Sequence, residues 1–200
     1  MSVPAREFRT NNARTLREID AWQTGSTEAA LEPALPIIDP HHHLREIESG
    51  RYHLPELACD LASGHNIRAT VFVDSQTMYR TGGPAQFRPV GETAFVIGHL
   101  AAHAEEKIAR FNPCAAIVGH VDLAHGAAVR TALEAHMAAG NGRFRGIRDP
   151  LIWDASDINY GARRPPPDRM ADAGFRAGFA QLAPLGLTFE AWLFHHQLGG

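Results

Sequence analysis

The sequence predicts an α/β domain with parallel strands, and three observations carry this prediction. The chain has 200 residues, 44% hydrophobic and 20% charged, which is enough to bury a sizeable core and is not typical of a disordered, collagen-like or coiled-coil protein. Short β-branched runs alternate with stretches of helical period. Such regular alternation is typical of parallel strands joined by right-handed crossovers.

The N-terminal arm comes first. Residues 1–35 are polar and contain one helical stretch over about 13–23, where Leu16, Ile19 and Trp22 recur at three-residue steps and form an apolar stripe. We expect this arm to pack on the domain that follows, residues 36–200.

Five strands are expected in that domain. Each is a short run rich in Val, Ile, Phe or Ala, bounded by Gly, Pro or polar residues. The runs are Ile37–Asp39, Ile67–Asp74, Ala115–Val121, Phe144–Arg148 and Leu187–Phe194.

Helical stretches separate the later strands. They are expected over about 92–110, where apolar residues fall near one face, over the alanine-rich 127–139, which Gly140 closes, and over about 170–182. Three consecutive prolines at 165–167 exclude a helix or a central strand there.

Composition excludes several classes of function. The formal net charge of −3, from 19 basic and 22 acidic side chains, gives no positive field to hold a nucleic acid. No segment approaches the roughly 18 apolar residues of a membrane span, and no signal peptide is recognisable. Cys59 and Cys114 are too far apart in sequence for a CxxC site. We therefore expect a cytoplasmic protein that acts on a small molecule, with neither nucleic acid nor membrane as partner.

Polar side chains follow the strands. In parallel sheets and barrels, ligands bind at the carboxyl ends of the strands. These ends carry His41 and His43, Asp74, His120 with Asp122, Arg148 with Asp149, and His195 with His196. Packing alone does not explain such a gathering.

The first of these ends is the most specific. Side chains alternate along a strand, so Asp39, His41 and His43 share one face. Two imidazoles in this spacing suit a divalent metal such as zinc, manganese or cobalt, with Asp39 orienting a ring. The alternative is a solvated histidine cluster or an ordinary bond between acid and histidine. The position at a strand end favours a metal or substrate site.

Residues 35–44, Leu-Pro-Ile-Ile-Asp-Pro-His-His-His-Leu, resemble the signature that ends the first barrel strand of the amidohydrolase superfamily. More specifically, they resemble the amidohydrolase-related group of metal-dependent barrel hydrolases, which contains sugar lactonases and a pyrone dicarboxylate lactonase. The likeness extends in the same order through residues 63–73, 89–93, 117–123, 142–148 and 187–195. It covers the chain from about residue 20 onward.

The resemblance implies a TIM-barrel-like (β/α) fold, incomplete with about five of eight strands. It also implies a hydrolase that acts on a lactone or related C–O or C–N bond of a small carboxylated or sugar-derived substrate. His41, His43 and His195 match metal positions for zinc or manganese, with His196 as the alternative to His195, although some lactonases of the group work without a metal. Arg148 matches a residue that binds a substrate carboxylate or carbonyl oxygen, unless it forms a salt bridge with Asp149 or Asp74.

Departures from the family pattern matter as well. Asp74, which we take as substrate-binding, stands where relatives have glutamate, and Arg45 stands where they have an aromatic residue. The family's sixth-strand histidine and eighth-strand aspartate have no counterpart, so the catalytic base is expected beyond residue 200. The alternatives are therefore a truncated, inactive fragment that forms homo-oligomers through open barrel edges, a decarboxylase of the same superfamily, and a metal-binding module without catalysis.

The remaining histidines are assigned to loops, helices and surfaces rather than to a site. They include His53, His65, His99, His103, His125 and His136.

Overall fold

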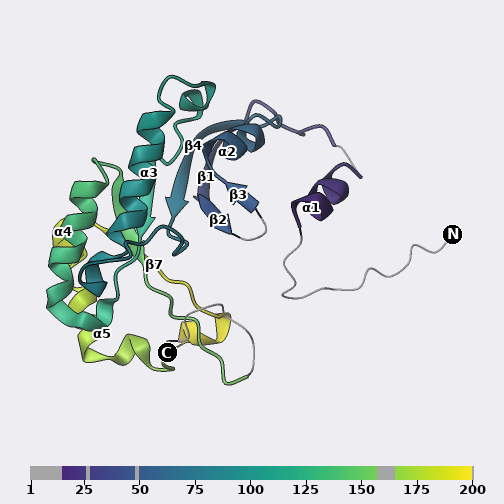
Figure 1. The fold of residues 1–200 in the computed structure, drawn as a ribbon. Helices are drawn as coiled ribbons and strands as arrows, with labels where there is room; N and C mark the ends of the chain where they lie inside the picture. Colours follow the sequence, from purple (N-terminus) through teal and green to yellow (C-terminus); the bar gives the residue numbers. More distant parts are fainter. Residues whose placement is uncertain (1–14, 26–27, 48–49, 157–164, 200) are drawn as a thin grey trace.

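Five parallel strands form the main sheet of the protein. A computed structural model describes residues 15–25, 28–47, 50–156 and 165–199, and in it the strands lie in the order β1-β4-β5-β6-β7 (Figure 1). Their bounds are Pro36–His42 for β1, Asn66–Val73 for β4, Ala116–Gly119 for β5, Phe144–Arg148 for β6 and Thr188–Glu190 for β7. The predicted α/β class, parallel sheet and five strands are confirmed.

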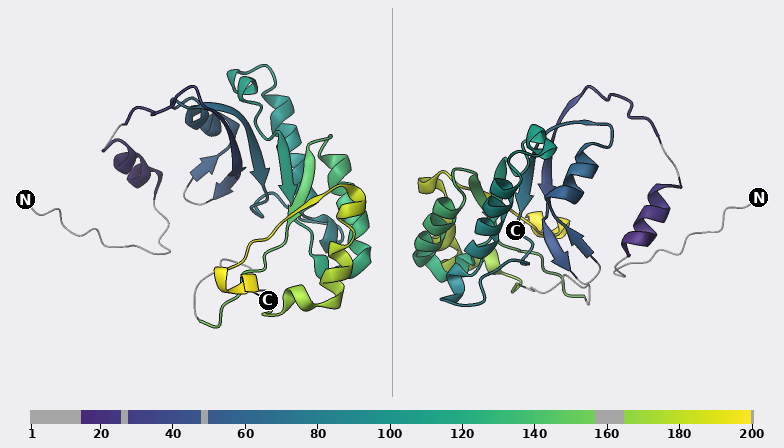
Figure 2. Two further views of the ribbon diagram at one scale, coloured as in Figure 1. Left: turned by 180° about the vertical axis from the view of Figure 1, so that it is seen from behind. Right: turned by 45° about the horizontal axis from the view of Figure 1, so that its top comes forward.

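Within this sheet, each strand after β1 pairs with the sheet strand that precedes it in sequence. Phe72 of β4, for example, lies opposite Ile117 of β5, and Ile147 of β6 lies opposite Phe189 of β7. The order never reverses, as it does in open doubly wound sheets, so the crossovers lie on one side. The sheet curls into a half-barrel with helices along its outer side (Figure 2). Within the described residues, β1 and β7 are the two edges.

The helices differ from the expected ones mainly in length. The α-helices are α1 (Leu16–Gln23), α2 (Leu54–Leu61), α3 (Val90–Ala102), α4 (Arg130–Ala139) and α5 (Ala173–Phe179). Of the short 3-10 turns, η2 (Lys107–Phe111), η3 (Leu123–Val129) and η4 (Arg169–Ala171) overlap the predicted stretches. The turns η1 (Ala85–Phe87), η5 (Ala183–Leu185) and η6 (His195–Gly199) lie outside them.

A hairpin and a helix between β1 and β4 were not predicted. Strands β2 (Arg45–Ile47) and β3 (Gly50–Tyr52) pair antiparallel, and α2 follows at once. The Glu56 side chain accepts a hydrogen bond from the His53 backbone N–H at 2.8 Å and thereby caps α2. Leu54, Leu57 and Leu61 form its buried face.

The core lies between the outer face of the sheet and the helices. Strand residues Phe72, Ile117 and Ile147 pack with Val96 of α3 and Leu133 of α4, and all five are at most 1% exposed. Both cysteines are free thiols, Cys59 exposed and Cys114 buried. None of the described helices has the length and apolar character needed to cross a membrane.

Strand β7 is shorter than predicted. It ends at Glu190, and the chain then passes into η6, so His195 lies on an exposed 3-10 turn rather than at the strand end. The close packing of β7 on β6 depends on Gly146, because a Cβ there would lie 2.5 Å from the Thr188 carbonyl oxygen.

We therefore expect Gly146→Ala to destabilise the protein by about 1–3 kcal/mol through overpacking against the β7 backbone. Chemical denaturation followed by circular dichroism measures this. The matched control is Gly98→Ala on α3, where a Cβ meets no atom within 4 Å, and helix propensity predicts a gain of up to about 1 kcal/mol. Equal stability of the two variants would contradict the packing argument.

Candidate substrate and metal site

The two predicted histidines at the end of β1 lie together. The Nε2 atoms of His41 and His43 are 3.3 Å apart, and their rings are nearly perpendicular with centroids 4.9 Å apart. His42 points to the opposite face, where it is buried and its Nε2 lies 2.8 Å from the Thr70 hydroxyl. The alternation predicted from the sequence therefore holds through this tripeptide.

The hydrogen bond of His43 fixes its ring. Its Nδ1 lies 2.7 Å from the Val73 carbonyl oxygen, which can only accept, so Nδ1 carries the proton and Nε2 keeps a lone pair. Burial lowers the pKa of His43, and the positive charge of Arg148 lowers it further. The lone pair directed towards His41 is consequently available at neutral pH.

Arg148, at the end of β6, reaches across the sheet. Its Nη2 donates to the Asp74 carbonyl oxygen at 2.5 Å, its Nη1 lies 3.4 Å from His41 Nε2, and its guanidinium carbon is 4.9 Å from the centre of the Trp192 ring. The alternative of a salt bridge with Asp149 is not what the structure shows, because Asp149 pairs with Arg169 at 2.6 Å. Arg148 is thus held by a carbonyl and an aromatic face.

Asp74 lies beside this cluster rather than in its centre. Its side chain is buried, and its Oδ1 accepts a hydrogen bond from the Tyr79 hydroxyl at 3.1 Å. The loop that follows Asp74 is held by Glu92, a buried carboxylate in the first turn of α3. Glu92 accepts bonds from the Ser75 backbone N–H at 2.9 Å, the Ser75 hydroxyl at 3.0 Å and the Thr77 backbone N–H at 3.2 Å.

His195 is not brought to the histidine pair. Its ring lies 5.6 Å from that of His196, whose Nε2 is 3.2 Å from the Trp153 carbonyl oxygen and 3.7 Å from Asp154 Oδ2. Among the residues that the structure describes, no three or more His, Cys, Asp or Glu side chains are arranged to hold a metal. The structure therefore assembles His41, His43 and Arg148, with Asp74 adjacent, and leaves His195 outside.

The spacing of the histidine pair fits two metal ligands. Two nitrogens bound to one zinc ion at about 2.0–2.1 Å and at the tetrahedral angle lie about 3.3 Å apart, which is the distance between the two Nε2 atoms. A guanidinium beside the pair adds a positive charge. Any metal bound here shares the site with a cation, and an anionic ligand would stabilise both.

Three residues that the sequence reasoning missed shape this end of the sheet. Trp192 and Tyr79 contact Arg148 and Asp74. The Gln197 amide accepts from the backbone N–H groups of Trp153 at 3.1 Å and Phe194 at 3.0 Å, and donates to the Leu151 carbonyl oxygen at 2.9 Å. No motif marks such residues: the partners of Gln197 are backbone groups, Arg148 is far from Trp192 in the sequence, and the five-residue spacing of Asp74 and Tyr79 is not a recognised pattern.

The histidine of α4 is part of the core. His136 is fully buried, its Nδ1 is 2.8 Å from the Thr93 hydroxyl and its Nε2 is 3.1 Å from the His120 carbonyl oxygen, and its ring stacks on Phe144. Burial lowers the pKa of His136 to about 4, and it does the same to His42. Both rings are therefore neutral in the folded protein at physiological pH.

Comparisons with known proteins found no relative. No protein-family model matches the chain. Searches of curated proteins and of solved structures gave no match either. Arguments about function therefore rest on the residues and their geometry.

The buried histidines predict a stability that falls with acid. The unfolded chain binds protons below its histidine pKa of about 6.5, whereas the folded chain binds them at His42 and His136 only near pH 4. The free energy of unfolding is therefore fully maintained above about pH 6.5, and each histidine reduces it by roughly 1.4 kcal/mol per pH unit between 6.5 and 4.

Urea denaturation over a pH series measures this slope. His136→Gln, which keeps polar groups near Thr93 and His120, should flatten the slope by about the share of one histidine. His65→Gln is the control, because His65 is exposed just before β4 and the slope should not change. An unchanged slope in His136→Gln would show that this residue is not the source.

Proposed function

We propose that the chain is an amidohydrolase-related hydrolase with TIM-barrel-type architecture, acting on a lactone or a related C–O or C–N bond of a small carboxylated substrate. The observation that carries the proposal is the convergence of the Arg148 guanidinium with the Nε2 atoms of His41 and His43. The sequential strand order, which (β/α) barrels share, supports the architecture. The carboxyl edge is where such barrels bind substrate.

Each group in the cluster has a role in this proposal. The half-buried Arg148 binds a substrate carboxylate or carbonyl oxygen through its Nη1, since its Nη2 is already bonded to the Asp74 carbonyl oxygen. Trp192 and that carbonyl keep the guanidinium oriented before the substrate arrives. The fixed charge stabilises negative charge that develops on the oxygen as the carbonyl is attacked.

The histidine pair supplies acceptors. When no metal is bound, His43 Nε2, kept unprotonated by the bond of Nδ1 to Val73, can accept a proton from an attacking water. A divalent zinc or manganese ion held by His41 and His43 would polarise the carbonyl as a Lewis acid. The 3.3 Å separation of the two nitrogens fits this ion.

The proposal also covers location and assembly. Two free cysteines, one of them exposed, suit the reducing cytoplasm. β1 and β7 are edges within the described residues, and Ile38 of β1 is 63% exposed. We propose that a second copy of the chain covers such an edge, and size-exclusion chromatography with light scattering distinguishes a dimer from a monomer.

Metal and substrate binding test the proposal together. We expect zinc or manganese titration by calorimetry to show binding that is lost in the double variant His41→Ala/His43→Ala. Arg148→Lys should keep metal binding but weaken binding of carboxylated lactones about tenfold or more, because an ammonium cannot replace the fork of the guanidinium. His65→Ala is the control, since His65 is exposed just before the amino end of β4, whereas the histidine pair lies at the carboxyl end of β1.

Turnover is measured with a lactone panel, with and without added metal. Release of CO₂ in place of hydrolysis would assign the decarboxylase alternative. If lactones bind without turnover, the chain is a binding fragment rather than an enzyme. If no lactone binds and His41→Ala/His43→Ala leaves metal binding unchanged, the proposed function is wrong.

A further inference from the structure

A cavity lies on the other side of the β6 end. It is a cavity of about 600 Å³ where β5 and β6 end, bounded by the starts of α3 and α4, by η3, and by the chain from Pro165 to Arg169. Successive side chains of a strand point to opposite faces. Arg148 accordingly faces the histidine pair, whereas the next residue, Asp149, lines this cavity.

One wall of the cavity is apolar. It is formed by side chains from the chain after β5, from η3 and α4, and from the chain after β6, namely Val121, Ala128, Val129, Ala132, Pro150 and Pro165. A volume of this size is ordinary for a small-molecule site, and such sites combine apolar walls with a few polar groups.

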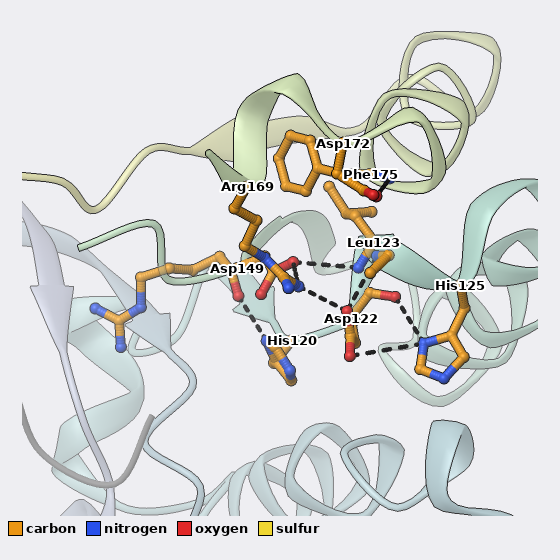
Figure 3. A network of polar contacts seen from close by, with 10 residues as sticks. His120, Asp122, Leu123, His125, Asp149, Arg169, Asp172 and Phe175 are labelled. Carbon is orange, nitrogen blue, oxygen red and sulfur yellow. Dashed lines mark hydrogen bonds and ion pairs between the residues drawn. The ribbon is translucent and has the colours of Figure 1, made fainter. Parts of the chain in front are cut away.

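The polar side is built on an ion pair network (Figure 3). Arg169 Nη2 donates to Asp122 Oδ1 and to Asp149 Oδ2, both at 2.6 Å. Asp149 Oδ2 also accepts the Leu123 backbone N–H at 3.1 Å, and its side chain is only 4% exposed. One guanidinium thus pairs with two carboxylates, so these three side chains together carry a net charge of −1.

That charge is accessible at Asp122. Its side chain is 45% exposed, and its Oδ2 lies 3.7 Å from His125 Nδ1, which is beyond hydrogen-bonding distance but close enough for an ion pair when His125 is protonated. Burial raises the pKa of Asp122, but hydrogen bonds from Arg169 and the Ala124 backbone outweigh this and lower it overall. The Asp122 carboxylate therefore stays ionised and offers an acceptor to a cationic group.

Positive groups line the same cavity. Arg88, at the end of η1, is exposed on its rim. Within the described residues its side chain has no hydrogen bond or ion pair, and Arg169 Nε is buried without a hydrogen-bond partner. Buried donors without acceptors are costly, so a ligand oxygen would be favourable here.

We propose that this cavity binds a free α-amino acid with an apolar side chain, its ammonium group on Asp122 and its carboxylate towards Arg88. Counted as charges, Asp122 and Asp149 balance Arg88 and Arg169, which matches a zwitterion rather than a simple cation or anion. The apolar wall takes the side chain. The inference does not depend on the proposed hydrolase activity, because none of the residues that bind here belongs to the histidine cluster.

Three probes with one hydrophobic body test the proposal in the full-length chain. They are L-phenylalanine, phenethylamine, which lacks the carboxylate, and 3-phenylpropanoate, which lacks the ammonium. We expect L-phenylalanine to bind in the micromolar to millimolar range and each truncated probe about tenfold more weakly, as measured by calorimetry or ligand-observed NMR.

Variants then assign each charge. Asp122→Asn should weaken the binding of L-phenylalanine and phenethylamine but not that of 3-phenylpropanoate. Arg88→Gln should weaken the binding of L-phenylalanine and 3-phenylpropanoate but not that of phenethylamine. Glu134→Gln is the matched control, since Glu134 pairs with Arg130 on α4 and does not line the cavity. Circular dichroism checks that each variant is folded.

A filling variant keeps the test decisive should Asp122→Asn not fold. Ala128→Phe occupies the cavity without touching the ion pairs and should abolish binding of all three probes. Binding that persists in Ala128→Phe, equal affinity for the three probes, or no binding of L-phenylalanine at millimolar concentration would overturn the proposal.

Discussion

In the main sheet, each strand after β1 pairs with the sheet strand that comes before it in the sequence. The arrangement of the molecule follows from this constraint. Parallel neighbours require crossovers, and crossovers of one hand in an order that never reverses place their helices on one side. A twisted sheet that is covered on one side only curls, and the side chains at its carboxyl edge are drawn towards each other. Residues as distant in sequence as His41 and Arg148 meet there for this reason.

Much of this arrangement can be predicted from the sequence. The bounds of β6 were predicted as observed, because Phe144–Arg148 is a short run between a turn and a proline. The shared direction of His41 and His43 followed from strand alternation alone. By contrast, β7 ends at Glu190, four residues before the predicted end, and beyond it the Trp192 carbonyl oxygen accepts a 2.9 Å bond from the Leu151 backbone N–H, just past β6. Such a tertiary bond has no local signature, and the expectation that His195 stands at a strand end failed with it.

The candidate site shows a similar limit. A guanidinium that donates to a backbone carbonyl cannot be foreseen from residue types, since every residue carries a carbonyl. The alternatives weighed for Arg148 were charged side chains, yet its strong bond is to the main chain of Asp74. Asp149 instead pairs with Arg169, which follows the three consecutive prolines and is marked by no motif. Sequence reasoning thus placed polar and charged side chains at the strand ends but could not assign their pairs.

The peptide unit between Arg148 and Asp149 lies between the histidine cluster and the cavity. Its flanking side chains point to opposite sides, and the Arg148 carbonyl oxygen accepts a bond from His120 Nδ1 at 2.9 Å. Because a planar trans peptide holds its two Cα atoms about 3.8 Å apart, a ligand that shifts the Arg148 backbone on one side would also shift Asp149 on the other. Thermodynamic linkage then requires reciprocity: whatever factor one ligand applies to the affinity of the second, the second applies to the first. A single peptide bond would in that case couple two binding equilibria.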